Sequence, residues 1–157
     1  MTFVLVKTVH VLGAVLFLGT GLGSAWTKFR ADRSGEPVVV AWAQREVVRN
    51  DWLFTVPSGI VMPVTGLWLA SLYGLPWTTG WVMLGIGCWA LAGVCWVPAA
   101  YLQIRMRTLA EQALADQAPL PDAFHRANLV WTLLGVPAFV AAMVAVWVMI
   151  AKPAVLG

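Results

Sequence analysis

Residues 52–104 read WLFTVPSGIVMPVTGLWLASLYGLPWTTGWVMLGIGCWALAGVCWVPAAYLQI, a run of 53 residues without one Asp, Glu, Lys or Arg. A transmembrane helix needs about 20 predominantly apolar residues, so two spans use about 44 of these and leave about 9 for a turn. Gly74, Pro76 and Gly80 interrupt the run near its middle and are typical of such a turn. The stretch therefore predicts a helical hairpin that crosses a bilayer twice.

Two further apolar segments flank this hairpin. Residues 8–27 carry no formal charge unless His10 is protonated, and residues 127–151 carry none. No segment shows the period-2 alternation of a membrane β-barrel. We expect an all-α fold, a single transmembrane four-helix bundle over residues 1–157 with cytoplasmic helical extensions. The predicted spans lie near residues 3–27, 51–73, 79–104 and 124–151.

The composition excludes the soluble and disordered classes. Hydrophobic residues make up 61% of the chain and charged residues 11%, against about 45–50% and about 25% in soluble domains. Disordered chains are polar and poor in aromatic residues, and this chain has ten tryptophans. No basic patch with interleaved aromatic residues is present, so we expect the lipid bilayer and no nucleic acid as a partner.

A cleaved signal peptide is the alternative for residues 3–27. Its amino-terminal region holds a single Lys, and its apolar run exceeds the 7–15 residues of a signal sequence. No A-x-A cleavage site precedes a soluble domain. A first transmembrane helix is therefore the favoured interpretation.

The basic residues predict the orientation. Eight of the ten lie in the two long connections: Lys28, Arg30, Arg33, Arg45, Arg49, Arg105, Arg107 and Arg126. The positive-inside rule then places both connections in the cytoplasm and both termini outside. Residues 38–50 and 103–116 have no Gly or Pro, so we expect them to be helical extensions of the second and third spans.

His10 is the most informative residue of the first helix. Lys7 and His10 are three positions apart and share a helix face with Gly13 and Phe17. A histidine about 10 Å inside a bilayer is costly and by default indicates function. Haem iron is often held by one histidine, so we predict non-covalent haem b with His10 as an axial ligand and Lys7 beside a propionate. The alternative is a helix–helix contact through His10 and Gly19-x-x-x-Gly23.

Depth along the helices predicts which residues join His10. Counting 1.5 Å per residue from the outer end places Thr65 and Met62 of the second helix near that level. Trp89 of the third helix and Met143 of the fourth reach the same level by this count. Met62 or Met143 is the candidate second iron ligand and Trp89 a wall of the cofactor site. Ordinary packing is the alternative role for all of them.

A second group of polar residues is predicted at the inner ends of the helices. It comprises Arg49, Asp51, Trp52, Gln103, Arg105, Arg107 and His125. The group has the chemistry to bind an anionic lipid head group, a propionate or a quinone head, and the alternative is a salt-bridged rim. We expect Asp51 to begin the second span and to pair with an arginine. His125 lies about 20 Å from His10 by helical rise, so the two cannot bind one iron.

Several segments carry a family resemblance. They are residues 6–23, 49–54, 63–68, 96–98, 103–107 and 136–138. In these the chain resembles, over nearly its whole length, an uncharacterised bacterial family of four-helix integral membrane proteins. Lys7-x-x-His10 is also similar to HemJ-type protoporphyrinogen oxidases, which carry haem b on a first-helix histidine. CopD-type membrane proteins share a histidine-bearing, Gly-rich helix. The resemblance implies a bacterial protein, so we expect it in the inner membrane, with both termini, which the positive-inside rule places outside, in the periplasm. A porphyrin or a quinone is the expected small-molecule partner.

Three function classes remain open. The first is a haem-b membrane protein with redox or porphyrin chemistry. The second is a small transporter or channel subunit, and the third is a structural or interaction protein, for example a homo-oligomer. No Ser/His/Asp, Cys/His or paired-carboxylate pattern is available for hydrolysis. If the chain is an enzyme, we therefore expect a cofactor-dependent oxidoreductase.

Overall fold

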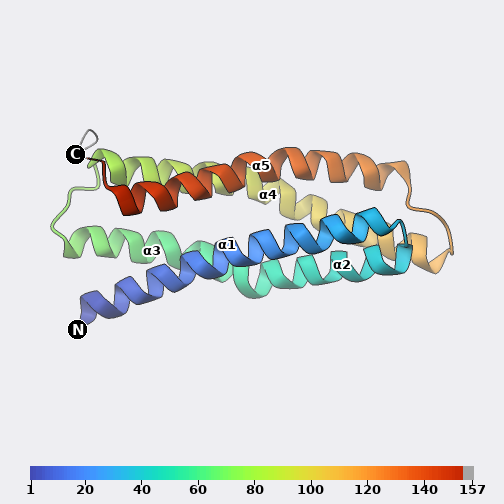
Figure 1. Ribbon diagram of the computed structural model, residues 1–157, viewed down its shortest axis with the longest axis horizontal. Helices are drawn as coiled ribbons and strands as arrows, with labels where there is room; N and C mark the ends of the chain where they lie inside the picture. Colours follow the sequence, from blue (N-terminus) through green and yellow to red (C-terminus); the bar gives the residue numbers. More distant parts are fainter. Residues whose placement is uncertain (154–157) are drawn as a thin grey trace.

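The computed structural model describes residues 1–153, and this part of the chain is helical with short connections. The helices are α1 (Thr2–Ser34), α2 (Pro37–Asn50), the π-helix η1 (Asp51–Thr55), α3 (Val56–Leu72), α4 (Gly80–Ala115) and α5 (Asp122–Ala151). Figure 1 shows them as one elongated bundle. The N-terminus, the α3–α4 connection and the end of α5 lie at one end of its long axis, which we name the outer end. The opposite end is the inner end.

Within residues 1–153, four helical segments are long and apolar enough to cross a membrane. They are α1, the continuous segment Pro37–Leu72, α4 and α5. This confirms the all-α fold and the four spans expected from the sequence. It also confirms the helical extensions, because α2 continues into the second span and α4 runs on to Ala115.

The helix ends fall at residues that favour a break. Gly35 ends α1 with a positive φ of 70°, a conformation that glycine adopts without steric cost. Pro37 then starts α2 in the first turn, where its missing N–H is not needed. Gly74 has a φ of 65° in the outer connection. These breaks direct the chain back through the bundle after each span.

One expectation about the second span is wrong. Asp51 does not begin a helix, because α2, η1 and α3 form one uninterrupted helical segment. No Gly or Pro separates Val38 from Val56 to stop it. The irregularity at this point is a π-turn in which the Val56 N–H donates to the Asp51 carbonyl, five residues back.

In the outer half of the bundle the helices pack as two separate pairs, whereas at the inner end α2 contacts a helix of each pair. α1 packs along α3, and α4 packs along α5, whereas α3–α4 and α1–α5 contacts are few (Figure 1). At the inner end α2 packs against both α1 and α4. A buried cluster of Val40, Ala41, Met106, Ala110 and Phe124 fills this region. The tightest core therefore lies at the inner end, and the outer half consists of two loosely joined helix pairs.

Candidate functional site

His10 is fixed by a hydrogen bond between α1 and α3. Its Nδ1 lies 2.9 Å from Thr65 Oγ1. The Thr65 hydroxyl donates its own proton to the Val61 carbonyl at 2.6 Å, so it accepts from His10 Nδ1–H. In the neutral imidazole this leaves Nε2 as an unprotonated nitrogen with a free lone pair. The contact thus selects the tautomer that can bind a metal or accept a hydrogen bond through Nε2.

Two glycines let α1 and α3 approach each other around His10. A Cβ built on Gly66 would lie 3.2 Å from His10 Cε1, and one built on Gly13 would lie 3.3 Å from Met62 Cγ. Both distances are shorter than ordinary van der Waals contacts, so larger residues would force the helices or side chains apart. The structure thus brings His10, Gly13, Met62 and Thr65 together.

The other residues predicted for this site lie elsewhere. Phe17 packs against Gly59, and the Trp89 Nε1–H donates to the Gly59 carbonyl at 3.1 Å. This level is about 9–10 Å deeper than His10 by helical rise. Met143 is 47% exposed on α5. Lys7 is exposed, with its ammonium 6.0 Å from the Phe3 ring centroid.

Asp51 is buried in the bundle interior, so its expected ion pair with an arginine is wrong. It is 6% exposed, and Oδ1 accepts a hydrogen bond from Thr55 Oγ1 at 2.8 Å. Oδ2 has no hydrogen-bond partner within residues 1–153. Gln103 is buried beside it. Arg49 is largely exposed and pairs with Glu46 at 3.1 Å. Arg49 and Asp51 are two positions apart on the helix, so their side chains point in different directions and do not meet.

Of the other residues of the predicted inner group, Arg107 is half-buried, with its Nε buried and without a hydrogen-bond partner in the described chain, whereas Trp52 and His125 lie at the surface. Trp52 is 63% exposed. His125 is exposed, with its ring edge-on to Phe124 at a centroid distance of 5.7 Å. The group therefore does not form one site.

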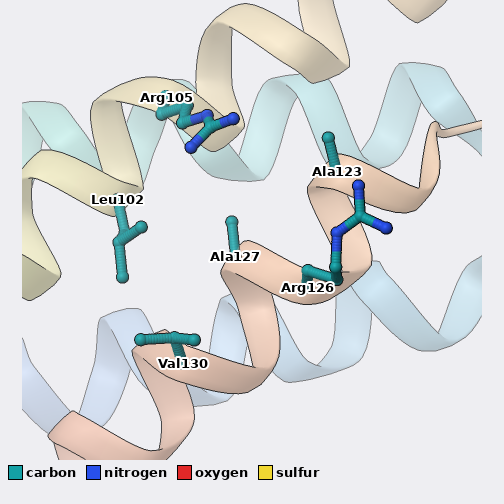
Figure 2. A pocket seen from close by; sticks show the side chains of 6 residues that line it. All are labelled: Leu102, Arg105, Ala123, Arg126, Ala127 and Val130. Atoms are coloured by element: carbon teal, nitrogen blue, oxygen red, sulfur yellow. The ribbon is translucent and has the colours of Figure 1, made fainter.

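Arg105 instead shares a shallow notch with Arg126. Figure 2 shows Arg105 on α4 and Arg126 on α5, with Leu102, Ala127 and Val130 between and below them. The hollow measures about 170 Å³. Neither arginine makes an ion pair with a residue of the described chain. The notch presents two positive charges above an apolar floor near the inner end.

A buried line of polar residues runs along the segment Pro37–Leu72, and we name it the polar seam. It consists of Gln44, Asp51, Thr55, Ser58 and Thr65, all less than 9% exposed. Four of its members are spaced seven residues apart, so they recur on one helix face. The seam extends about 30 Å by helical rise. Ser58 and Thr65 donate to carbonyls of their own helix, whereas both amide atoms of Gln44 are buried without a partner in the described chain.

Lys28 is a buried lysine that was not predicted from the sequence. Lys28 Nζ donates to Asp32 Oδ2 at 2.5 Å and to Asn128 Oδ1 at 2.7 Å. The Asn128 amide donates to the same carboxylate oxygen at 3.0 Å, and the rings of Phe124 and Trp131 lie 5.4 and 5.2 Å from the ammonium. The four-residue spacing of Lys28 and Asp32 was a signal for their pairing. Nothing local in the sequence indicated that α5 would bury them.

Comparison with known proteins gives a family without an assigned activity. The profile of the family described as "Predicted integral membrane protein (DUF2269)" matches residues 4–153, nearly the whole chain. No curated protein and no solved structure matches. The family match agrees with the resemblance to an uncharacterised family of integral membrane proteins. The comparisons give no support to a similarity with HemJ-type or CopD-type proteins.

Proposed function

We propose that this chain, which belongs to the DUF2269 family of predicted integral membrane proteins, binds haem b non-covalently through His10 Nε2. The observation that carries the proposal is the hydrogen bond from His10 Nδ1 to Thr65 Oγ1. Metal-bound histidines generally donate their other ring N–H to such a partner, which fixes the ring and its tautomer. A single histidine is sufficient for haem iron, so no larger group of ligands is needed.

The surroundings of His10 support a planar ligand more than a bulky one. In the outer half of the bundle, the helix pair α1–α3 makes few contacts with the pair α4–α5. His10 lies in this outer half, where a flat ligand has less packing to displace between the two pairs. Met62, next to Gly13, remains the candidate second ligand. Met143 is exposed on α5, which argues against Met143 as the second iron ligand. Trp89 lies deeper in the bundle than His10, so we no longer propose that Trp89 forms a wall of the haem site. Lys7, one turn outward from His10, remains the candidate propionate partner.

The proposed chemistry divides between the cofactor and the chain. Haem b would supply one-electron redox chemistry or porphyrin recognition. The chain would supply a fixed imidazole nitrogen and an apolar surround within the bilayer. The substrates that fit such a site are membrane-soluble, which keeps a porphyrin or a quinone as the proposed partner.

Visible absorption of the purified protein tests this proposal. The full chain is expressed with haem supplied, purified in mild detergent and compared with two histidine variants. We expect a Soret band that is lost or strongly weakened in His10→Ala and largely kept in His125→Ala, the matched control. A colourless wild type would refute the proposal, and a band lost only in His125→Ala would refute the choice of His10.

A second candidate function is proton movement along the polar seam. The specific observation is that Asp51 Oδ2 and the Gln44 amide are buried without partners in the described part of the chain. Ionisable groups within a span commonly mark a proton or solute path. The part of the seam that lies inside the predicted second span, from Asp51 to Thr65, extends about 21 Å by helical rise, about two thirds of the thickness of the hydrocarbon core.

Proton flux into proteoliposomes tests this second candidate. With an internal pH dye and an imposed pH gradient, wild-type liposomes should acidify faster than empty ones. Asp51→Asn should remove the difference, whereas Gln112→Leu, a change at an exposed position of α4, should not. Equal rates for wild-type and empty liposomes would exclude this candidate.

A further inference from the structure

Two arginines from different helices meet at the notch between α4 and α5, and neither has an acidic partner. Arg105 and Arg126 line this hollow, with their guanidinium groups at its rim (Figure 2). Neither makes an ion pair within residues 1–153. Asp122 lies one turn before Arg126, but it is exposed and does not line the notch. The notch therefore presents two positive charges that no residue of the described chain neutralises.

Both arginines lie at the inner boundary of the apolar part of the bundle. Arg105 is the first charged residue after the uncharged run of residues 52–104. Arg126 is the last charged residue before the uncharged run of residues 127–151. The polar head groups of a bilayer begin where its hydrocarbon core ends. The two guanidinium groups are therefore placed at the level of the lipid phosphates, whichever way the protein is inserted.

The floor of the notch is apolar and continues toward the outer end. It is formed by Leu102, Ala127 and Val130. Val130 and Leu133 are three residues apart on α5, so they share a helix face, and they are 46% and 65% exposed. All of these residues lie on the hydrocarbon side of the two arginines. A ligand whose charged group sits in the notch can therefore extend an apolar part along this face of α5.

We propose that the notch binds the phosphate of one anionic phospholipid, whose acyl chains lie along the apolar face of α5. A guanidinium group presents several N–H donors in a planar fork that matches the oxygens of a phosphate. Two such groups favour a head group of net negative charge. A zwitterionic lipid carries a cation next to its phosphate, which the two arginines repel. Basic pockets between transmembrane helices are known to bind anionic head groups.

Mass spectrometry of the intact protein in detergent tests this site. The full chain is titrated with phosphatidylglycerol or with phosphatidylcholine of the same acyl chains. The wild type should bind one phosphatidylglycerol about tenfold more tightly than phosphatidylcholine, as expected when two basic residues contribute. Arg105→Gln and Arg126→Gln should each weaken the binding of phosphatidylglycerol by about fivefold.

Arg30→Gln is the matched control. Arg30 is an exposed arginine near the inner end of α1 that makes no ion pair in the described chain and does not line the notch. The variant loses the same charge from the same end of the bundle, so it should bind phosphatidylglycerol like the wild type. Circular dichroism should show equal helicity for all variants.

Three results would overturn the proposal. The first is equal affinity of the wild type for the two lipids, which would show that the notch does not select an anionic head group. The second is equal weakening by Arg30→Gln and Arg126→Gln, which would indicate general attraction to the basic inner end. The third is displacement of the lipid by a similar concentration of glycerol phosphate, which lacks acyl chains and would identify a soluble phosphate as the ligand. None of these outcomes depends on whether haem is bound.

Discussion

Lys28 shows how a single charged residue is accommodated inside this bundle. Its ammonium makes two hydrogen bonds, one to a carboxylate and one to an amide, and two aromatic rings lie over it. Burying a charge is tolerated only when such partners replace its water. The lysine therefore joins α1 to α5 at the inner end, where these helices otherwise make few contacts.

Lys28→Ala should reduce stability strongly. Removing one partner of a buried pair typically costs about 3–5 kcal/mol, because the other charge stays buried and unpaired. Asp32 retains some exposure, so we expect about 3 kcal/mol in the free energy of unfolding, measured by denaturant titration in detergent. Arg45→Ala removes the exposed pair with Glu111 and should cost at most about 1 kcal/mol. Equal losses for the two variants would contradict the assigned role of Lys28.

Thr65 should affect haem binding although it does not touch iron in the proposed site. Thr65→Val keeps the side-chain shape but removes the acceptor for His10 Nδ1–H, so the imidazole can rotate and change tautomer. Loss of such a partner typically lowers metal affinity about 10–100-fold, and haem titration should show a decrease of this size. Ser58→Ala, a seam residue without a bond to His10, is the control. An unchanged affinity in Thr65→Val would show that the hydrogen bond is unimportant for binding.

At the scale of the element, the segment Pro37–Leu72 determines most of the interior polarity. Its polar residues recur at intervals of seven and face inward, while Arg45, Trp52 and Leu53 point outward. Gln44 is the extreme case, because it is fully buried and neither amide atom has a partner in the described chain. An unbonded buried amide is destabilising unless it binds water or a ligand.

Gln44→Met therefore distinguishes a merely unpaired amide from a bound one. If nothing binds the amide, replacing it by an apolar side chain of similar shape should raise the free energy of unfolding by about 1–3 kcal/mol. Gln112→Met on the exposed face of α4 should change it by less than about 0.5 kcal/mol. A loss of stability in Gln44→Met would contradict this expectation and would reveal an ordered partner of the amide.

The helices could be predicted from the sequence because their signals are local. Apolar length gave the four spans, and the absence of Gly and Pro after Pro37 and after Pro98 gave the inner extensions. The side of each helix that meets a neighbour is a long-range property. Counting depth from the outer end brought Thr65 to His10 correctly but placed Trp89 about two turns too far outward. Asp51 was predicted to start a helix because it is the last charged residue before the uncharged run of residues 52–104. In the structure the helical backbone continues past Asp51 through a π-turn.

At the scale of the whole molecule, four crossings place the start of α1 and the end of α5 on one side. The outer end has Lys7 and Lys152 as its basic residues, whereas the connections at the inner end carry the other eight. Cytoplasmic loops are enriched in Lys and Arg, so the inner end should face the cytoplasm. The notch of Arg105 and Arg126 would then lie beside anionic head groups of the inner leaflet.

Cysteine labelling in whole cells tests this orientation. In a Cys88→Ala, Cys95→Ala background, Thr2→Cys should react with an impermeant maleimide added outside. Gln112→Cys, exposed near the end of α4, should react only after the membrane is permeabilised. Labelling of Gln112→Cys from outside, with Thr2→Cys protected, would show that the protein is inserted the other way round.

The position of iron in crystals of the haem-loaded protein is the measurement that bears most directly on the central proposal. An anomalous difference map collected at the iron edge should show one peak within bonding distance of His10 Nε2. The His10 Nδ1 should still lie within hydrogen-bonding distance of Thr65 Oγ1. A peak beside His125, or haem-loaded crystals whose iron lies away from every histidine, would contradict the account.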